Sequence, residues 1–520
     1  MVQDVNLRVP PFAASDIKLL EKEASKTLRI DAGRIKSARI TRRSIDARQR
    51  KVMVNITLRV YVDEVPDDMR LVKPVDYPVL DSDAPEAVVV GAGPAGLFAA
   101  LRLIELGIRP VVLERGKDVD SRRKDMADIA RSNRVDPDSN YCFGEGGAGA
   151  YSDGKLYTRS KKRGSVDKIL TVFNQFGAQD DILIDAHPHI GTDRLPEVIK
   201  NMRRQIIASG GEVHFSSRVT DILLRDETVV GVMTADGKIY SGPAILATGH
   251  SARDIYELLL AKNISIEPKG LAIGVRLEHP QKLIDCIQYH SPEGRGKYLP
   301  AAEYSMLTRI DGRAVYSFCM CPGGFIIPAA SGPDQLVVNG MSPSSRGTKW
   351  ANSGMVVEIL PEDIDNGNAD PLKMMKYQAD IEHRFFEDAG HTQNAPAQRM
   401  LDFTAKRKSD TLPPTSYAPG IHSSMMNDLL PRPIAERLRK GFVEFGKKSK
   451  GFLTNDAVLI GCETRTSSPV RITRDKDTLE HVGIKNLFPC GEGAGYAGGI
   501  VSAAIDGERC ADALAAKLLK

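Results

Sequence analysis

The chain has 520 residues. At about 150 residues per domain, this length favours roughly three domains and excludes a single small module. Apolar residues make up 42% and charged residues 27% of the chain, an ordinary balance that excludes a collagen-like chain or one disordered throughout. The net charge is +4, but residues 1–80 hold 16 Lys and Arg against 11 Asp and Glu, whereas residues 81–520 hold 55 against 56. Any attraction for a polyanion would therefore come from the first 80 residues.

Cysteine usage and the first residues bear on the compartment. Seven cysteines, an odd and sparse set, argue against a secreted disulfide framework. The first ten residues lack the apolar stretch of a signal peptide. The longest apolar stretch, 87–104, is broken by Gly91, Gly93, Pro94 and Gly96, so it does not predict a membrane span. We expect a cytoplasmic protein with no membrane contact, and the sequence leaves its oligomeric state open.

Residues 1–62 predict a small basic α+β domain. A strand is expected at 5–9, followed by a helix capped by Ser15 with Ile17, Leu20 and Ala24 on one face. Two alternating stretches, 34–45 and 51–62, predict a hairpin. This strand–helix–strand–strand order suggests a ferredoxin-like domain. The proline-rich stretch 66–85 predicts a linker, so the first domain with its linker spans 1–80.

The next unit begins as a nucleotide-binding fold. A strand at 86–90, a helix at 94–106 and a strand at 109–114 predict a Rossmann-like strand–helix–strand. Farther on we expect a helix from a Thr192 cap to residue 209 and strands at 213–215, 219–225, 229–234, 239–241 and 244–247. Between 270 and 451 the pattern changes to short strands, Gly/Pro-rich loops and helices near 372–387 and 433–445. A strand at 487–489 and a helix at 500–518 return to the first pattern. The sequence thus predicts an α/β Rossmann-like domain, 81–265 and 452–520, with an α+β substrate domain, 266–451, inserted into it.

One glycine motif stands in the context of a dinucleotide-binding loop. Gly91-Ala-Gly93-Pro-Ala-Gly96 follows an apolar strand and opens a helix, and the acid Glu114 ends the next strand. In such a loop the first glycine allows the turn, the second lets the backbone approach a pyrophosphate, and the third allows the helix and strand to pack. The helix N-terminus favours the phosphate charge. Glu114 is expected to accept hydrogen bonds from the adenosine ribose. NAD and FAD share this fingerprint, so the motif alone does not choose between them.

Two further motifs carry a resemblance to flavoproteins. Ala244-Ile-Leu-Ala-Thr-Gly249 resembles the second nucleotide-contacting strand of two-dinucleotide-type flavoproteins. Phe488-Pro-Cys-Gly-Glu-Gly-Ala-Gly-Tyr-Ala-Gly-Gly499 resembles their C-terminal flavin motif, with Glu492 where aspartate is commoner. The three motifs in this order resemble the glutathione-reductase-like FAD superfamily.

More closely, the chain resembles the uncharacterised FAD-dependent dehydrogenase family with a small appended N-terminal domain. The segments that carry this resemblance are 144–155, 274–280, 318–324, 350–354 and 463–465. The resemblance implies bound FAD and supplies no substrate. The residues that the motifs and the resemblance assign to the cofactor are Gly91, Gly93, Pro94, Ala95, Gly96, Glu114, Arg115, Gly146, Gly147, Ala148, Ser152, Asp153, Gly154, Lys155, Val219, Ala247, Thr248, Gly249, Gly491, Glu492, Gly498, Gly499 and Ile500.

The glycine-rich loop 144–155 allows two interpretations. Five glycines among twelve residues expose backbone N–H groups and permit close approach to a cofactor. In related flavoproteins a loop here runs under the pyrophosphate and the isoalloxazine, so Ser152 or Asp153 could touch the flavin or a substrate. The alternative is an ordinary surface loop.

The sequence offers few candidates for acid–base or substrate-binding chemistry. Flavin carries the redox step itself, and the protein supplies position and electrostatics. The candidates are Arg276, His279, Arg346, Asn352 and Arg465, although a structural role is the commoner one for a single Arg or His. Arginines that converge on a flavin would suit a carboxylate or phosphate substrate.

The cysteines and histidines favour structural roles. Cys319-Met-Cys321 has a spacing that differs from the C-x-x-C of flavin disulfide reductases, and a regular strand would put both side chains on one face. We expect structural thiols there, and no His/Cys set shows convincing metal-ligand spacing.

Three functional hypotheses follow. The first is an FAD-dependent oxidoreductase that transfers a hydride at flavin N5 to or from a small, anionic molecule, with NADH or NADPH as a possible electron donor. The second is an FAD-dependent RNA-modifying or RNA-associated protein, because residues 34–51 carry eight Lys and Arg against Asp46 alone. The third is a flavin-binding scaffold without turnover.

Overall fold

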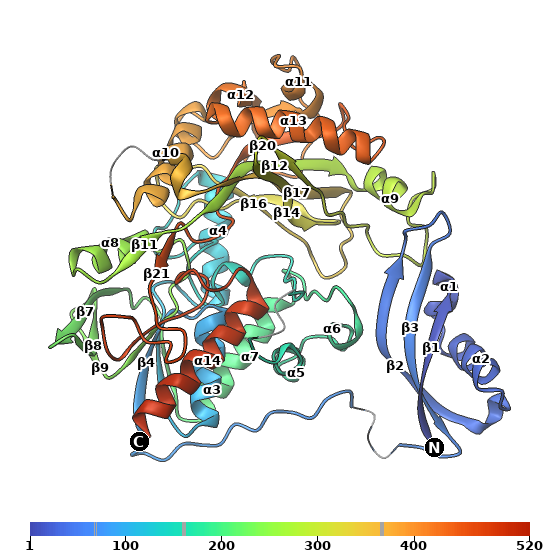
Figure 1. The fold of residues 1–520 in the computed structure, drawn as a ribbon, viewed down its shortest axis with the longest axis horizontal. Helices are drawn as coiled ribbons and strands as arrows, with labels where there is room; N and C mark the ends of the chain where they lie inside the picture. Colours follow the sequence, from blue (N-terminus) through green and yellow to red (C-terminus); the bar gives the residue numbers. More distant parts are fainter. Residues whose placement is uncertain (67, 69, 159–162, 365–368, 520) are drawn as a thin grey trace.

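A computed structural model describes residues 1–66, 68, 70–158, 163–364 and 369–519. The proline-rich stretch expected to be a linker includes residues 67 and 69, which lie outside this set. Figure 1 shows three parts: a small N-terminal part, a parallel-sheet part that holds the C-terminus, and a large sheet above it covered by helices.

The N-terminal part is a three-stranded antiparallel sheet with helices on one face. Its elements are β1 (Val2–Val9), α1 (Pro11–Ala14), α2 (Ile17–Leu28), η1 (Ala32–Arg34), β2 (Ile35–Asp46) and β3 (Met53–Val62). The strand order β1-β3-β2 places the hairpin strand β3 in the middle. Among the described residues this sheet has three strands, and no helix and fourth strand follow β3 as in a complete ferredoxin-like fold. The expectation is therefore met only for the first three strands. Asp16, and not Ser15, caps α2, because its carboxylate accepts the N–H groups of Lys18 and Leu19.

The second part is built on a five-stranded parallel sheet. Its elements are β4 (Glu86–Val90), α3 (Pro94–Glu105), β5 (Arg109–Leu113), α4 (Val119–Ser132), η2 (Gly147–Gly149), α5 (Val166–Gln175), α6 (Asp181–Ile184), α7 (Leu195–Ala208), β6 (Glu212–His214), β7 (Val219–Arg225), β8 (Thr228–Thr234), β9 (Ile239–Ser241), β10 (Ala244–Leu246), α8 (Arg253–Ala261), β22 (Leu487–Pro489) and α14 (Ile500–Leu518). The strand order is β22-β10-β4-β5-β6. Because the chain leaves β4 toward β5 and returns on its other side as β10, a crevice opens at the carboxyl ends of β4 and β10.

Glycines let the elements of this part approach closely. A Cβ on Gly96 would lie 1.8 Å from the Gly91 carbonyl oxygen, and one on Gly507 would lie 2.1 Å from the Ala95 carbonyl oxygen. Helices α3 and α14 therefore pack side by side against the parallel sheet (Figure 1). Helix α7 begins at Leu195 without a side-chain cap, and Thr192, the predicted cap, instead donates to Met341 Sδ.

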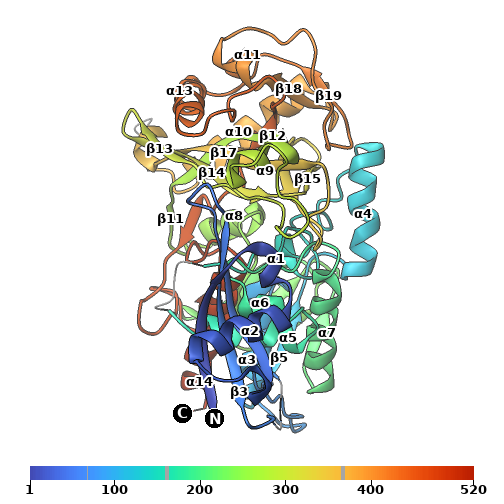
Figure 2. The same ribbon diagram turned by 90° about the vertical axis from the view of Figure 1, so that its right-hand side faces the viewer.

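The third part is a seven-stranded sheet covered by helices. Its elements are β11 (Ile266–Pro268), β12 (Leu271–Pro280), α9 (Gln281–Tyr289), β13 (Leu307–Ile310), β14 (Arg313–Cys321), β15 (Phe325–Pro328), β16 (Val338–Met341), β17 (Trp350–Ile359), η3 (Pro361–Ile364), α10 (Lys373–Asp388), β18 (Ala395–Arg399), α11 (Met400–Thr404), β19 (Ile421–Ser423), α12 (Met426–Leu429), α13 (Arg432–Lys448), β20 (Val458–Glu463) and β21 (Val470–Ile472). The order of the main sheet is β13-β14-β17-β12-β20-β18-β19. Helices α10 to α13 lie over its outer face in both views (Figures 1 and 2). The boundary expected at residue 452 comes too early, because β20 still pairs with β12 in this sheet.

The tip of the N-terminal hairpin reaches the third part. His290, just after α9, hydrogen bonds to the Ala47 carbonyl oxygen at 2.9 Å, and Ala47 and Val52 pack against the core of the large sheet. Figure 2 shows the hairpin rising in front of the parallel-sheet part toward α9. The first part is therefore held at both ends, by its linker and by its hairpin tip.

Candidate functional site

A cavity of about 420 Å³ lies at the carboxyl ends of the parallel strands, beneath the large sheet. The turns that follow β4, β5 and β10 form one wall, and the loop 144–155 and the N-terminus of α14 form others. Phe318, Cys319 and Asn339 close it from the large sheet. This is where a doubly wound parallel sheet binds its ligand.

Most of the predicted cofactor residues surround this cavity. Those that line it are Gly91, Gly93, Pro94, Ala95, Glu114, Arg115, Gly147, Ala148, Ser152, Asp153, Gly154, Lys155, Val219, Ala247, Thr248, Gly249, Glu492, Gly498, Gly499 and Ile500. Gly96, Gly146 and Gly491 do not line it. Gly96 packs against Gly91, the Gly146 N–H donates to the Ala92 carbonyl oxygen at 2.8 Å, and the Gly491 N–H donates to Asp506 at 2.8 Å. These three glycines support the walls from behind.

Two helices begin at the cavity with their first N–H groups uncapped. Gly93 precedes α3 and Gly499 precedes α14, and neither helix receives a side-chain cap. Free N–H groups and the helix dipole make both positions favourable for anionic groups. A Cβ built on Gly249, Gly498 or Gly499 meets no atom within 4 Å. Open space therefore adjoins the α14 terminus.

Glu114 organises the dinucleotide loop. Its carboxylate is buried and accepts three backbone N–H groups, from Ala92, Gly116 and Gly144, each at 2.9 Å. A carboxylate has about four acceptor positions, so about one remains for a ribose hydroxyl. The residue that the sequence assigned to the ribose thus also joins the phosphate loop to the loop 144–155.

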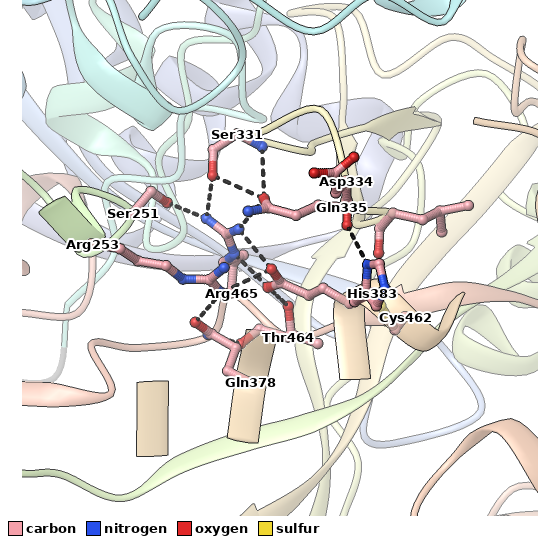
Figure 3. A network of polar contacts seen from close by, with 12 residues as sticks. Ser251, Arg253, Ser331, Asp334, Gln335, Gln378, His383, Cys462, Thr464 and Arg465 are labelled. Carbon is pink, nitrogen blue, oxygen red and sulfur yellow. Dashed lines mark hydrogen bonds and ion pairs between the residues drawn. The ribbon is translucent and has the colours of Figure 1, made fainter. Parts of the chain in front are cut away.

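Arg465 is the one candidate arginine that lines the cavity, and its five N–H groups are already used. It pairs with the buried Glu382, with Nε 2.7 Å from Oε1 and Nη2 2.9 Å from Oε2. The remaining N–H groups donate to Ser251, Ser331 and Gln335 (Figure 3). Arg465 therefore fixes the wall of the cavity and has no donor left for an anionic substrate.

The other candidates also have partners of their own. Arg346 forms a two-point ion pair with Asp153, with Nη2 2.6 Å from Oδ2. Arg276 is fully buried, lies 3.2 Å from Glu463 and donates to Asn352 at 2.9 Å. These contacts explain why Arg346, Arg276 and Asn352 stand behind the cavity wall.

His279 is a core residue. It is fully buried among Phe452 and Tyr304, and its Nε2 lies 2.8 Å from the Phe452 carbonyl oxygen. Burial lowers the pKa of His279 to about 4, so the ring is neutral at pH 7. The expectation that His279 approaches a substrate is wrong, because its strand turns this side chain into the core of the large sheet.

Residues 270–466 match the family described as FAD-dependent protein, C-terminal domain-like, and residues 85–129 match an FAD binding domain. Residues 1–61 match a domain of unknown function. An uncharacterised protein of Clostridium beijerinckii is 39% identical over 530 residues, which cover 98% of this chain and 97% of that protein. The chain belongs to this FAD-dependent protein family. It is an FAD-dependent oxidoreductase.

The comparisons do not extend to the finer resemblance. The FAD binding domain matched at 85–129 belongs to a different branch of flavoproteins from the glutathione-reductase-like superfamily. Among solved structures, the flavin-dependent brominase Bmp2 aligns over 83% of this chain and 79% of its own, with 13% identity and a TM-score of 0.36. A geranylgeranyl bacteriochlorophyll reductase-like protein from Thermoplasma acidophilum aligns over 84% and 78%, with 12% identity and a TM-score of 0.34.

The cavity of this FAD-dependent protein fits its cofactor in charge and shape. The uncapped termini of α3 and α14 offer N–H groups to negative or electron-rich atoms. The glycines at 249, 498 and 499 leave space that side chains would otherwise fill. The residues present can therefore hold a dinucleotide with its diphosphate at α3.

Sequence reasoning missed His250, which directly follows the Ala-Thr-Gly motif. His250 lines the cavity, its Nε2 lies 3.8 Å from Glu492 Oε1, and its buried Nδ1 has no hydrogen-bond partner. Burial, helped by Arg465 and Lys269, lowers the pKa of His250 to about 3. Burial also raises the pKa of Glu492 to about 7, although Lys269 opposes the shift. Because His250 directly follows a motif assigned to the cofactor, its sequence position could have indicated that it lines the cavity.

Sequence spacing also missed a buried cluster of Cys490, Asp506 and Cys510, whose ligand atoms lie within 4.8 Å of one another. Arg474 occupies both carboxylate oxygens of Asp506, at 2.7 and 2.9 Å. Because a guanidinium already neutralises this carboxylate, the cluster fits a structural role behind β22.

The basic hairpin of the FAD-dependent protein uses several of its charges internally. Arg43 binds Asp185 and Asp181 of the α6 region, Arg34 binds Asp63, and Arg48 binds Asp46. The two Arg43 contacts tie the N-terminal sheet to the parallel-sheet part. Among the described residues, no helix is both long and apolar enough to span a bilayer.

Replacing Glu114 with glutamine should weaken both the fold and FAD retention. The amide group would bring an N–H donor to face one or two backbone N–H groups that now donate to the carboxylate. An unsatisfied buried donor costs about 1–3 kcal/mol. Thermal unfolding and the flavin-to-protein absorbance ratio would measure the two effects. Glu257→Gln, on the exposed face of α8, should change neither, and an unchanged Glu114→Gln protein would contradict this role.

Proposed function

We propose that the protein binds FAD along this cavity and transfers a hydride between flavin N5 and a small molecule. The observation that carries the proposal is the uncapped N-terminus of α14, which faces open space beside Glu492 and His250. When bound, FAD supplies the two-electron chemistry, and the protein supplies position and electrostatics.

Different residues along the cavity would bind different parts of FAD. The N-terminus of α3 and the backbone of the loop 144–155 would hold the diphosphate. Glu114 would hold the ribose with its remaining acceptor position, and the first N–H groups of α14 would stabilise negative charge on the flavin. Glu492, with its raised pKa, can hold or accept a proton at the substrate side. His250 stays neutral there and can offer a hydrogen bond.

Lys155 is the feature that favours an anionic substrate. Arg115, Arg218 and Arg465, which also line the cavity, are each paired with a carboxylate. Within the described residues, Lys155 is the lining Lys or Arg that forms no ion pair, and its ammonium contacts the Met320 carbonyl oxygen. A substrate carboxylate or phosphate would therefore meet Lys155 first.

Anaerobic addition of NADH and then NADPH to the purified protein tests this function. We expect a visible flavin band that one of the nicotinamides bleaches, with a slower rate when the transferred hydrogen is deuterium. A Lys155→Met variant should keep its FAD and require a higher concentration of the anionic reactant. A protein that purifies without FAD would overturn the proposal. If neither nicotinamide bleaches the flavin, NADH and NADPH are excluded as electron donors, and the hydride must come from another organic molecule.

A further inference from the structure

Cys319 and Cys321 lie where β14 stops pairing regularly with β17. The register of this pairing shifts between Phe318 and Cys321, and Cys319 adopts a φ of 42°. A left-handed φ is unfavourable for a residue with a side chain, and such strain is kept mainly at functional sites. The irregularity brings Cys319 to the cavity wall while Cys321 stays fully buried. The regular strand expected from the sequence, with two equivalent thiols on one face, is not formed here.

The two thiols are held together as a pair. The Cys321 thiol donates to the Cys319 carbonyl oxygen at 3.4 Å. Arg276 holds both residues from below, with Nη2 2.7 Å from the Cys319 carbonyl oxygen and 3.3 Å from Cys321 Sγ. The same guanidinium therefore holds both cysteines at one bend of β14, and a disulfide between them needs only a local rearrangement of this bend.

The surrounding charges make the two thiols unequal. The neighbouring Cys321 thiol lowers the pKa of Cys319, burial raises it, and Lys155 and Arg276 lower it further. The carboxyls of Asp153, Glu463 and Glu492 also face Cys319 and act against the thiolate. The neighbouring Cys319 and burial raise the pKa of Cys321. Cys319 is thus the more acidic thiol and lies at the cavity beside cations, whereas Cys321 is buried. This arrangement is typical of a reactive cysteine with a partner thiol.

We propose that Cys319 and Cys321 form a redox-active dithiol that exchanges an electron pair with the flavin of this cavity. The proposal rests on the proposed function, because FAD must occupy the cavity. In the oxidising direction the two S–H bonds break and one S–S bond forms. The two electrons and two protons released pass to oxidised FAD, which becomes FADH₂. In air, dioxygen takes them from FADH₂ and leaves as hydrogen peroxide. In the reducing direction FADH₂ returns the electrons and protons, and the disulfide opens.

An anaerobic reductive titration of the air-oxidised holoprotein tests the proposal. The wild-type protein should accept four electrons per FAD, two for the flavin and two for the disulfide. Cys319→Ser and Cys321→Ser should each accept two. Cys286→Ser, which removes a thiol of α9 outside this cavity, should still accept four. The two serine variants test the pair independently if one of them fails to fold.

A chemical readout needs no variant. Trypsin releases residues 314–346, a peptide that holds Cys319 and Cys321 and no other cysteine. In denatured, air-oxidised protein this peptide should resist iodoacetamide, and after reduction it should take up two alkyl groups. Wild-type protein that accepts two electrons per FAD, with both cysteines alkylated before reduction, would overturn the dithiol and leave the proposed function intact. Protein without FAD would overturn the proposed function instead.

Discussion

Replacing Gly93 with valine should yield a folded protein that purifies without FAD. Gly93 has an ordinary φ of −76°, and a Cβ built on it meets only Gly147 Cα, at 3.9 Å. The fold therefore tolerates a side chain here, but that side chain would extend between the two loops that line the phosphate region. Overfilling a packed site costs about 1–3 kcal/mol, which corresponds to about a 5- to 150-fold loss of affinity. The flavin-to-protein absorbance ratio after gel filtration measures the loss.

The other two glycines of the motif show why Gly93 is the informative position. A Cβ on Gly91 would lie 2.4 Å from the Ala247 carbonyl oxygen, and one on Gly96 would lie 1.8 Å from the Gly91 carbonyl oxygen. Substitution at either position disturbs the fold itself. Gly483→Val is the matched control, because the Cβ of this exposed glycine meets only the His481 ring, at 3.9 Å. Full FAD in Gly93→Val would show that the diphosphate binds elsewhere.

Replacing Glu382 with alanine should cause one of the largest losses of stability in the chain. Its fully buried carboxylate binds Arg465 at 2.7 Å and Arg253 at 2.8 Å. Without it, two guanidinium groups would remain buried with no counter-charge. Removing one partner of a buried ion pair typically costs about 3–5 kcal/mol. Chemical denaturation of both proteins would measure the change in free energy of unfolding.

The pH dependence of this effect has a definite sign. Burial raises the pKa of Glu382, but Arg253 and Arg465 more than offset it, so the pKa falls to about 2 from an ordinary value of 4.5. A lowered folded-state pKa stabilises the protein above the unfolded-state value and loses that contribution as the pH falls through the folded-state value. The difference between wild type and Glu382→Gln should therefore shrink as the pH falls from 4.5 toward 2. Glu444→Ala, which breaks an exposed ion pair on α13, should leave stability unchanged. A Glu382→Ala protein as stable as that control would contradict a buried, charged network.

The fold was predictable where its signals are local. The strand Glu86–Val90, the glycine turn and helix α3 lie within twenty residues, and each has its own signature of apolar run, glycine spacing and helical periodicity. The helix Ile500–Leu518 appears with the expected bounds for the same reason. The boundary predicted at residue 452 is wrong because β20 is an apolar strand whose sequence is compatible with either sheet. Its partner β12 lies far away in the sequence, and only that pairing assigns it.

The roles of the charged candidates depended on distant partners. Arg346 is neutralised by Asp153, 193 residues earlier, and Arg276 by Glu463, 187 residues later. No periodicity relates such residues, because only the tertiary structure brings them together. Arg346 and Asp153 come from different parts of the fold, whereas Arg276 and Glu463 come from paired strands of the large sheet. Sequence reasoning could name the arginines but could not show that carboxylates already hold them.

The sequence by itself determined the nucleotide-binding loop, the resemblance to FAD-dependent proteins and the order of the main elements. These features rest on local spacing, which survives without knowledge of the rest of the chain. The tertiary structure alone decided that His279 belongs to the core, that His250 meets Glu492, and that Cys319 reaches the cavity. The reason is physical. A side chain's direction depends on strand register, and a shift of one residue in the pairing of β14 with β17 turns a side chain to the other face.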